Sequence, residues 1–305
     1  MTQIPLKVVA IGGGAAGFFG AIACAQTHPH TQVTLLEAGR EVLSKVRISG
    51  GGRCNVTHAC FDTAQLVQNY PRGNKALRGA FSRFQPRDTI AWFESRGVKL
   101  KTESDGRMFP VTDDSATIVD CLIQAAKEVG VKIRTNVSVI SIKVSQPNPS
   151  SLASKFEVKL KSGEIVECDR LLLATGSNPI GYQIAKSLGH TIETPVPSLF
   201  TFTIPDPQLR ELAGVSVDNA CVRLQVNGKT EFTQTGAILI THWGFSGPAI
   251  LKLSAWGARV LHDRQYQATL AIDWLPQYKQ ESLRELLLKV KSQLAQRQIA
   301  SSCPL

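Results

Sequence analysis

A strand-like run, three spaced glycines and a helix-like run follow one another near the start of the chain. Leu6–Ile11 is a short apolar run of the kind found in buried parallel strands. The G-x-G-x-x-G pattern of residues 12–17 comes next and opens a stretch of small apolar residues, which is typical of a helix packed closely on a sheet. A second strand-like run, Val33–Leu36, ends in Glu37. Because parallel pairing of two consecutive strands requires such a crossover, the pattern predicts an α/β fold.

The three glycines have separate physical tasks in a dinucleotide-binding turn. Gly12 permits the tight turn, Gly14 lets a pyrophosphate approach the backbone, and Gly17 lets the helix pack closely on the strand. The free N–H groups and the positive end of the helix attract phosphates. Glu37 can accept hydrogen bonds from ribose hydroxyls. We therefore predict dinucleotide contacts from Gly12, Gly14, Ala15, Ala16, Gly17, Glu37 and Ala38.

FAD and NAD share this fingerprint, so other parts of the chain must distinguish them. The apolar run "LLLATGS" is typical of a buried strand, and it ends in Ala174, Thr175 and Gly176. Flavoproteins with two dinucleotide-binding domains carry such a turn where the chain returns beside the cofactor. The turn favours FAD, and an ordinary strand-to-loop turn is the alternative. No second NAD(P) fingerprint follows, although NAD(P)H stays a candidate electron donor.

Periodic patterns predict the other elements. Residues 116–129 have apolar side chains at helical spacing, with candidate N-caps at Asp113, Asp114 and Ser115 and a stop at Gly130. The remaining predictions are one alternating strand over 131–144, a turn-rich loop over 145–154, hairpins across 162–163 and 227–228, a helix capped by Ser246 with Pro248 in its first turn, and an amphipathic helix over about 280–298.

Five segments are more specific than the fingerprint, namely "RISGGGRCNVT", "GRMFP", "LLLATGS", "LGHTIETPVPSL" and "THWGFSGPAIL". In this order they resemble the YhiN/BaiN-like flavoproteins, also called the aminoacetone-oxidase family, and the likeness runs from residue 5 to the end of the chain. The resemblance implies an FAD-binding, glutathione-reductase-like Rossmann domain interrupted by a mostly β insert with a helical appendage. We accordingly expect the FAD domain over 1–190 and the insert, with the start of its helical part, over 191–305.

The resemblance also implies a role for the three consecutive glycines in "RISGGGRCNVT". In such flavoproteins this segment crosses the pyrophosphate, the ribityl chain and the edge of the isoalloxazine, and glycines would let the backbone reach the flavin. Three cations would supply charge to the diphosphate or to the reduced flavin. A flexible surface loop is the alternative. The implied contacts are Lys45, Arg47, Ser49, Gly50, Gly51, Gly52, Arg53, Cys54 and Asn55.

Other residues take roles only through the resemblance. Val139 would make a backbone contact to adenine, although a core valine is nearly as well supported. Arg107 and Phe109 resemble the family segment that covers the flavin. His242 and Arg53 are weak catalytic candidates, His242 as a proton carrier, and a structural role is favoured for His242.

The family pattern continues with a Gly-Glu, an Asp and a Gly-Gly-Tyr-Asn-like turn that close the flavin site. These are not among the 305 residues. We therefore expect an FAD domain without its closing segment, and an inactive truncated product is an alternative reading. The leading expectation is an FAD-dependent oxidoreductase acting on a small molecule. Neither the substrate nor the oligomeric state follows from the sequence.

Seven scattered cysteines without a C-x-x-C argue against a disulfide framework and a zinc site. Cys60 is too far along the chain from Cys54 for a redox pair, so a redox-active Cys54 is disfavoured. The histidines share no metal-ligand spacing, and no metal is predicted. No stretch approaches the roughly 20 apolar residues of a membrane span. Since no signal peptide is recognisable, we expect a cytoplasmic protein.

The formal charge of +10 favours an anionic partner, either a phosphate-rich cofactor or nucleic acid. Arg72, Lys75 and Arg78 are three apart, with Arg83 and Arg87 following, and a solvated helix face is the simplest interpretation. Some flavoproteins with this fingerprint modify tRNA, so a nucleic-acid-binding flavoprotein is a further alternative. We disfavour it because the basic residues lack the interleaved aromatics of a single-strand platform.

Overall fold

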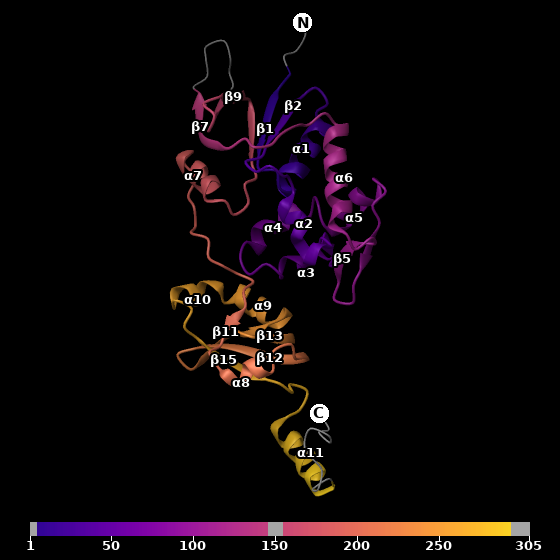
Figure 1. Ribbon diagram of the computed structural model, residues 1–305, viewed down its shortest axis with the longest axis vertical. Helices are drawn as coiled ribbons and strands as arrows, with labels where there is room; N and C mark the ends of the chain where they lie inside the picture. Colours follow the sequence, from indigo (N-terminus) through magenta and orange to yellow (C-terminus); the bar gives the residue numbers. More distant parts are fainter. Residues whose placement is uncertain (1–4, 146–154, 294–305) are drawn as a thin grey trace. The chain divides into compact units, whose positions relative to one another are not determined.

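The structure, a computed structural model, describes residues 5–145 and 155–293. Its backbone contacts divide the chain into two compact units, Met1–Glu193 and Thr194–Leu305, drawn from indigo to salmon and from salmon to yellow in Figure 1. Within the described ranges, no helix is both long and apolar enough to cross a membrane.

A parallel sheet lies at the centre of the first unit. Its strand order is β10-β1-β2-β6, and every neighbouring pair is parallel. Strand β1 thus lies between β2, the next strand in the chain, and β10, the last strand of this sheet. Because these pairs are parallel, the chain must cross over between them. This arrangement confirms the predicted α/β, Rossmann-type class. The strands are β1 (Lys7–Ile11), β2 (Gln32–Leu36), β6 (Lys132–Arg134) and β10 (Arg170–Leu173).

Two helices and the sheet build the main core of this unit. Helix α1 (Ala15–Thr27) contacts β1 and β2, and α6 (Ser115–Glu128) packs on α1. Phe18, Ile22 and Val119 are completely buried between them. The predicted cap of α6 is confirmed at Asp114, whose carboxylate accepts a hydrogen bond from the Ala116 N–H at 2.8 Å.

One predicted strand is wrong. The alternating run 131–144 is split between β6 and β7 (Val139–Ser145), which belong to different sheets. Asn136 has a φ of 57°, and the Val137 N–H donates to the Glu37 carbonyl at 2.8 Å. The chain therefore leaves the parallel sheet after β6. The alternating pattern could not reveal this, because the bond to Glu37 is a tertiary contact.

Antiparallel pieces complete the first unit. Strand β7 pairs with β8 (Lys155–Leu160), which pairs with β9 (Ile165–Cys168) across the predicted turn at 162–163. Most of the predicted loop 145–154 lies outside the described residues. A second small sheet has the order β3-β5-β4. The other elements are α2 (Ser44–Ile48), the 3-10 turn η1 (Ser49–Gly52), β3 (Thr57–His58), α3 (Thr63–Val67), α4 (Asn74–Phe81), α5 (Pro86–Glu94), β4 (Leu100–Thr102), β5 (Arg107–Pro110) and α7 (Pro179–Ser187).

The second unit is a five-stranded antiparallel sheet backed by helices. Its strand order is β11-β14-β13-β12-β15. The predicted hairpin is confirmed, with positive φ at Asn227 (51°) and Gly228 (76°), as a two-residue hairpin turn requires. The elements are β11 (Phe202–Thr203), α8 (Pro207–Glu211), β12 (Ser216–Val226), β13 (Lys229–Thr241), β14 (Gly244–Ser246), α9 (Pro248–Trp256), α10 (Ala258–Asp263), β15 (Thr269–Asp273) and α11 (Gln280–Gln293).

One detail of the second unit differs from expectation. Ser246 belongs to β14 and does not cap the following helix, whose N-cap is Gly247 with a φ of 99°. A side chain is excluded at this position because a Cβ would lie 2.8 Å from the Ala237 carbonyl oxygen. The predicted helix over 280–298 is present up to Gln293, and its last residues lie outside the described part of the chain.

Candidate cofactor-binding cavity

The turn between β1 and α1 is packed so tightly that glycine is required. Gly12 has a φ of 110°, and its N–H donates to the Leu36 carbonyl at 2.8 Å. A Cβ on Gly12 would lie 2.4 Å from the Ala174 carbonyl oxygen, and one on Gly17 would lie 1.8 Å from the Gly12 carbonyl oxygen. Both positions therefore exclude a side chain because protein backbone occupies the space.

Gly14 is different. A Cβ at this position would meet no atom of the protein within 4 Å. Gly14 is the N-cap of α1 and has an ordinary extended φ of −86°. Neither strain nor packing explains a glycine here, whereas the open space at the helix N-terminus is suited to a ligand phosphate.

Glu37 ties this turn to the end of β2. Its Oε2 accepts a hydrogen bond from the Gly13 N–H at 2.7 Å, and its Oε1 accepts one from the Gly39 N–H at 2.7 Å. A carboxylate has about four acceptor sites, so each oxygen can accept a further hydrogen bond. The Glu37 side chain is thus held in place and can still accept hydrogen bonds from a ligand.

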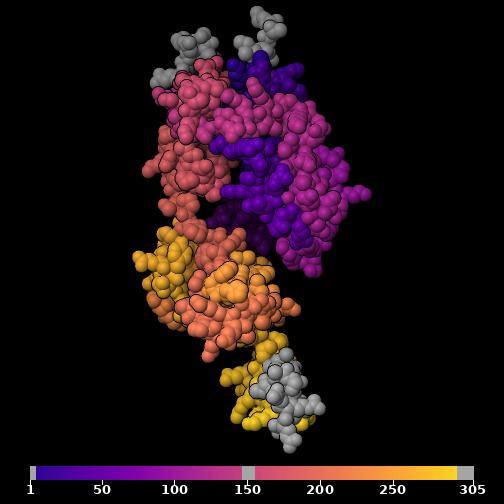
Figure 2. All heavy atoms as spheres, in the orientation of Figure 1, coloured from indigo at the N-terminus to yellow at the C-terminus, as the bar shows by residue number. Residues whose placement is uncertain are grey.

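Gly12, Gly14 and Glu37 line a cavity of about 1170 Å³ in the first unit. The space-filling view shows a hollow between the α7 segment and the indigo N-terminal segment (Figure 2). Its volume exceeds the ~300–1,000 Å³ of ordinary small-molecule sites. The lining comes from four parts of the chain: Gly12–Ala16, Phe19 and Glu37; Leu43–Val46, Ser49 and Cys54–Val56; Phe84, Thr89, Phe93, Ile118 and Leu122; and Leu173–Pro179.

Polar groups from distant segments meet in this lining. The Lys45 Nζ donates to the Ser177 Oγ at 3.1 Å and joins α2 to the turn after β10. That turn contains the predicted Ala174, Thr175 and Gly176, and it ends in Asn178, which caps α7 through a 3.1 Å bond from the Ile180 N–H. The structure therefore brings the fingerprint, Glu37, Lys45 and the "ATG" turn to one cavity.

The three consecutive glycines lie beside the cavity but do not line it. Gly50, Gly51 and Gly52 have φ values of 58°, 70° and 85°, conformations that side chains rarely adopt. A Cβ on Gly50 would lie 2.8 Å from both the Asn55 nitrogen and the Phe109 Cε1. The run thus makes a compact turn on buried Phe109. Its neighbours Ser49, Cys54 and Asn55 do line the cavity, and flavin contact by the glycines themselves stays a prediction.

Arg53 is held by carboxylates and does not line the cavity. Its Nη1 lies 2.6 Å from Glu103 Oε1 and 3.4 Å from Asp113 Oδ1, and its guanidinium stacks over the Phe109 ring at 4.0 Å. Hydrogen bonding to Glu103 raises the Arg53 pKa. Charge supplied by Arg53 to the cofactor stays a prediction.

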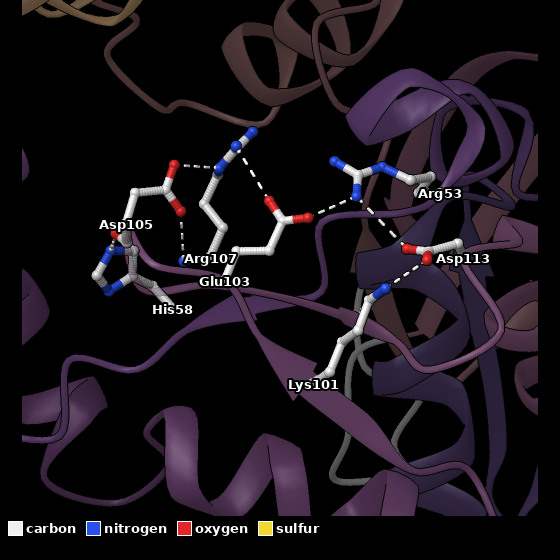
Figure 3. A network of polar contacts seen from close by, with 7 residues as sticks. All are labelled: Arg53, His58, Lys101, Glu103, Asp105, Arg107 and Asp113. Carbon is white, nitrogen blue, oxygen red and sulfur yellow. Dashed lines mark hydrogen bonds and ion pairs between the residues drawn. The ribbon is translucent and has the colours of Figure 1, made fainter. Parts of the chain in front are cut away.

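The network around Arg53 extends along β4 and β5, as Figure 3 shows. Asp113 also accepts a hydrogen bond from Lys101, and this contact, followed by Arg53, holds the pKa of Asp113 below its usual range. Arg107 is bonded to Asp105 at 2.7 Å and to Glu103 at 3.2 Å. The charges are thus compensated within the network, which joins the turn of η1 to the β4–β5 hairpin.

Cys54 lines the cavity with a buried thiol. Its backbone has a φ of 62°, and its N–H donates to the Ser49 carbonyl at 2.9 Å. Burial raises the pKa of this thiol, and a hydrogen bond with Ser49 opposes that shift only in part. A raised pKa lowers the thiolate fraction, so the site does not activate Cys54 as a nucleophile.

Four other predicted residues lie away from the cavity lining. Val139 is buried in the core with Ile142 and Val158, which agrees with the core interpretation of this valine. Arg47 accepts a hydrogen bond from the Ser115 hydroxyl through its carbonyl oxygen at 2.7 Å. Ala38 is exposed just beyond β2, and His242 is exposed in the turn between β13 and β14 of the second unit.

Sequence reasoning missed the apolar part of the lining. Its residues are Phe19 of α1, Phe84 just before α5, Phe93 near the end of α5, and Ile118 and Leu122 of α6. The four helical residues fit an ordinary helical core pattern, so no signal in the sequence distinguishes them. Asn178-Pro179 could have been found, because Asn followed by Pro is a helix-start signal directly after the "ATG" turn.

Residues 6–257 match the model of the HI0933-like protein Rossmann domain. Over 287 residues, the chain is 29% identical to the 3-dehydro-bile acid delta(4,6)-reductase of Clostridium scindens. This alignment covers 92% of this chain and 67% of that protein. It is 31% identical over 260 residues to the ribosomal RNA dihydrouridine synthase of Escherichia coli, covering 81% of this chain and 60% of that one.

The chain thus spans 60% to 67% of the length of these two curated relatives. Among solved structures, it is similar to the open conformation of a flavocytochrome c3 fumarate reductase. That likeness has a TM-score of 0.45 and 20% sequence identity, and it covers 71% of this chain and 47% of the other.

Proposed function

Since the chain belongs to the HI0933-like family of FAD-dependent oxidoreductases, we propose that it is an FAD-dependent reductase that saturates a ring C=C bond, with NAD(P)H as the electron donor. The observation that carries this proposal is the convergence of the α1 N-terminus, Glu37, Lys45 and the turn after β10 on one cavity. Each of these elements supplies a group that a dinucleotide needs.

The residues present fit FAD. Gly14 leaves open space where a pyrophosphate would approach the backbone N–H groups of α1. Glu37 retains acceptor sites for ribose hydroxyls, and Lys45 contributes a positive charge to the same lining. Phe19 and Phe84 contribute an apolar surface to the same lining. FAD, when bound, would supply the hydride-transfer chemistry.

The names of the two relatives share one kind of reaction. The first is a reductase of the delta(4,6) bonds of a 3-dehydro bile acid, and the second makes dihydrouridine. A 3-dehydro group is a ring ketone, and dihydrouridine is uridine whose C5=C6 bond has been saturated. Both reactions add two hydrogens to a ring C=C bond conjugated with a carbonyl. This common chemistry supports a conjugated ring as the acceptor in our proposal.

The first test is FAD binding by the purified 305-residue chain, with Gly14→Ala as a matched variant. FAD in excess should raise the melting temperature of the wild type, by the equivalent of about 2.7 kcal/mol at a hundredfold excess over Kd. Gly14→Ala should fold, because its Cβ meets nothing and a changed N-cap costs at most about 1 kcal/mol. It should lose most of the FAD-dependent rise, since the methyl group occupies the phosphate position.

The second test is turnover. Under anaerobic conditions, NADPH or NADH should bleach the flavin absorbance, and a 3-oxo-4,6-diene steroid or a uridine-containing oligonucleotide should restore it. Product mass should increase by two hydrogens. An oxidised flavin that returns only on admission of O2, with neither acceptor consumed, would contradict the reductase proposal and leave an oxidase. Equal FAD binding by the wild type and Gly14→Ala would contradict the proposed cofactor position.

A further inference from the structure

A second cavity, of about 440 Å³, lies in the first unit. It shares no lining residue with the candidate cofactor cavity. Gly12 and Ala174, which line the cofactor cavity, follow the carboxyl ends of β1 and β10. By contrast, the second cavity is lined by Lys7, Gln32 and Lys132, the first residues of β1, β2 and β6. The two cavities therefore lie at opposite ends of the parallel strands.

The floor of the second cavity is one face of the parallel sheet. Side chains alternate between the two faces of a strand, and the cavity is lined by every second residue of β2 and β6. These residues are Gln32, Thr34, Lys132 and Arg134. Lys7 is in register with Gln32, and Lys132 is in register with Thr34. Because the faces of a parallel sheet are usually covered and apolar, five polar side chains on one face require a physical reason.

The wall of the second cavity is β9 with the turn before it, since residues 164–167 line it. In Figure 1, β9 lies beside β1, and the two strands are in contact. The Arg134 guanidinium donates to both carboxylate oxygens of Glu164, at 2.8 and 2.7 Å. On β1, the Lys7 N–H donates to Asp169 Oδ2 and the Asp169 N–H donates to the Lys7 carbonyl, both at 2.8 Å. Tertiary contacts therefore hold the wall against the floor.

The lining of the second cavity has an excess of positive charge. Arg134 and Glu164 compensate each other, and the bond from Arg134 lowers the pKa of Glu164, which the charge of Lys132 lowers further. Within the described residues, the ammonium groups of Lys7 and Lys132 form no ion pair, and Glu167 is the remaining carboxylate of the lining. Unpaired lysines are common on protein surfaces, but these two line one walled cavity, where their fields add.

Lys7 and Lys132 are close enough to contact a single anion. Strands lie about 4.8 Å apart and residues rise about 3.3 Å along a strand. With β2 between them and a register difference of two residues, the two Cα atoms are roughly 12 Å apart. Each ammonium group ends a flexible four-carbon stem. An anion above Gln32 and Thr34 can therefore accept hydrogen bonds from both lysines.

The chemistry of this lining fits a small phosphorylated sugar. A phosphate monoester carries a charge of about −1.5 to −2 at pH 7, which suits two ammonium groups. Sugar hydroxyls can donate to Glu167 and exchange hydrogen bonds with the Gln32 amide and the Thr34 hydroxyl. The volume lies within the ~300–1,000 Å³ of small-molecule sites. Inorganic phosphate would leave the amide, the hydroxyl and the carboxylate unused, and an apolar ligand would leave every one of these groups unpaired.

We propose that the second cavity binds a small phosphorylated sugar. Lys7 and Lys132 bind the phosphate, and Gln32, Thr34 and Glu167 bind the hydroxyls. This site is separate from the candidate cofactor cavity and does not depend on the proposed function.

The test is isothermal titration calorimetry with ribose 5-phosphate, and with inorganic phosphate and ribose titrated separately. Saturating FAD is present throughout, so that the N-terminus of α1 does not take up the phosphate of the probe. The double variant Lys7→Gln, Lys132→Gln is compared with the control double Lys229→Gln, Lys252→Gln. The two control lysines are exposed in the second unit, and the change in net charge is identical.

The wild type and the control double should bind ribose 5-phosphate equally, and more tightly than they bind phosphate or ribose. The cavity double should bind it at least roughly tenfold more weakly, because charge-assisted hydrogen bonds are lost. Thr34→Val keeps the shape of the side chain but removes its hydroxyl. This variant should bind ribose 5-phosphate about fivefold more weakly and inorganic phosphate unchanged. An unchanged melting temperature without ligand establishes that each variant is folded.

Equal affinities of the two double variants for ribose 5-phosphate would overturn the proposal. Ribose 5-phosphate bound no more tightly than inorganic phosphate would overturn it as well, since the hydroxyls would then make no contact. The same holds if millimolar ribose 5-phosphate gives no heat of binding with the wild type. None of these outcomes bears on the cofactor proposal, because no residue of the second cavity lines the first.

Discussion

For single residues, the protein uses glycine for three different physical reasons. Gly12 and Gly17 are glycines because backbone fills the space of a side chain, and Gly50 adopts a positive φ while lying against Asn55 and Phe109. Gly14 has neither constraint, which leaves ligand approach as the reason for it. The same residue type therefore predicts different consequences of mutation at different positions.

Gly17→Ala should destabilise the first unit. Its Cβ would lie 1.8 Å from the Gly12 carbonyl oxygen, and neither backbone segment can move without disturbing β1. We expect a loss of about 1–3 kcal/mol in urea unfolding. Gly79→Ala is the matched control within another helix, where a Cβ meets nothing. It should be neutral or stabilise the protein by up to ~1 kcal/mol. Equal losses for the two variants would refute the packing explanation.

Cys54 should be an unreactive thiol in the folded protein. Burial hides its sulfur and raises its pKa, so alkylation requires local opening. With iodoacetamide at pH 8, followed by peptide mass spectrometry, we expect Cys54 to label at least roughly tenfold more slowly than the half-buried Cys60. In urea the two rates should converge. Fast labelling of Cys54 in the native protein would point instead to an activated thiol.

Between elements, charged side chains connect segments that the backbone ladder does not join. Arg53 follows η1, Glu103 lies between β4 and β5, and Asp113 precedes α6. Arg53 thus connects a segment bordering the cavity to two others. Ser49, Cys54 and Asn55 line that cavity. The network therefore positions part of the cavity lining, although its own side chains do not line the cavity.

This network predicts a specific acid dependence. The contacts with Lys101 and then Arg53 depress the Asp113 pKa in the folded protein, below an unfolded value of about 3.9. The stability from this carboxylate is therefore complete above about pH 4 and is lost as the pH falls through the folded pKa. Asp113→Asn should lower the melting temperature at pH 7 but not at pH 2.

Lys101→Met tests the same interaction from the other partner. Lys101→Met should remove much of the same pH-dependent stability. The loss of stability in the double variant should be smaller than the sum of the two single losses, because both changes break the same contact. Strictly additive losses would mean that the two side chains stabilise the fold independently. Chemical denaturation at several pH values measures both effects.

For the molecule as a whole, the candidate cofactor site lies entirely within the first unit. Every residue that lines the cavity falls between Gly12 and Pro179, whereas the second unit has its own core around Val222, Ile250 and Leu253. Binding of FAD should therefore act first on the residues of one unit.

Hydrogen exchange with mass spectrometry can measure which unit FAD protects. On addition of FAD, amide protection should increase in peptides covering residues 43–56 and 173–179, since both segments line the cavity. Peptides from the β12–β13 hairpin serve as the internal reference, and a smaller change is expected there. Protection confined to the hairpin would place the cofactor outside the cavity.

The sequence alone was sufficient for features that depend on local chemistry. The β1–α1–β2 unit follows from the switch between an apolar run, spaced glycines and a helical pattern, and the structure agrees with it. The Asn227-Gly228 hairpin follows from residues that tolerate a positive φ. The family resemblance, carried by short glycine-containing segments, was likewise correct.

Contacts between distant segments required the folded structure. Nothing near Arg53 in the sequence predicts its pairing with Glu103 and Asp113, 50 and 60 residues away, and the split of residues 131–144 depends on a bond to Glu37. The apolar lining of the cavity is a feature of the same kind. Local propensity acts over a few residues, whereas these features arise from which segments pack together, and packing is a property of the complete chain.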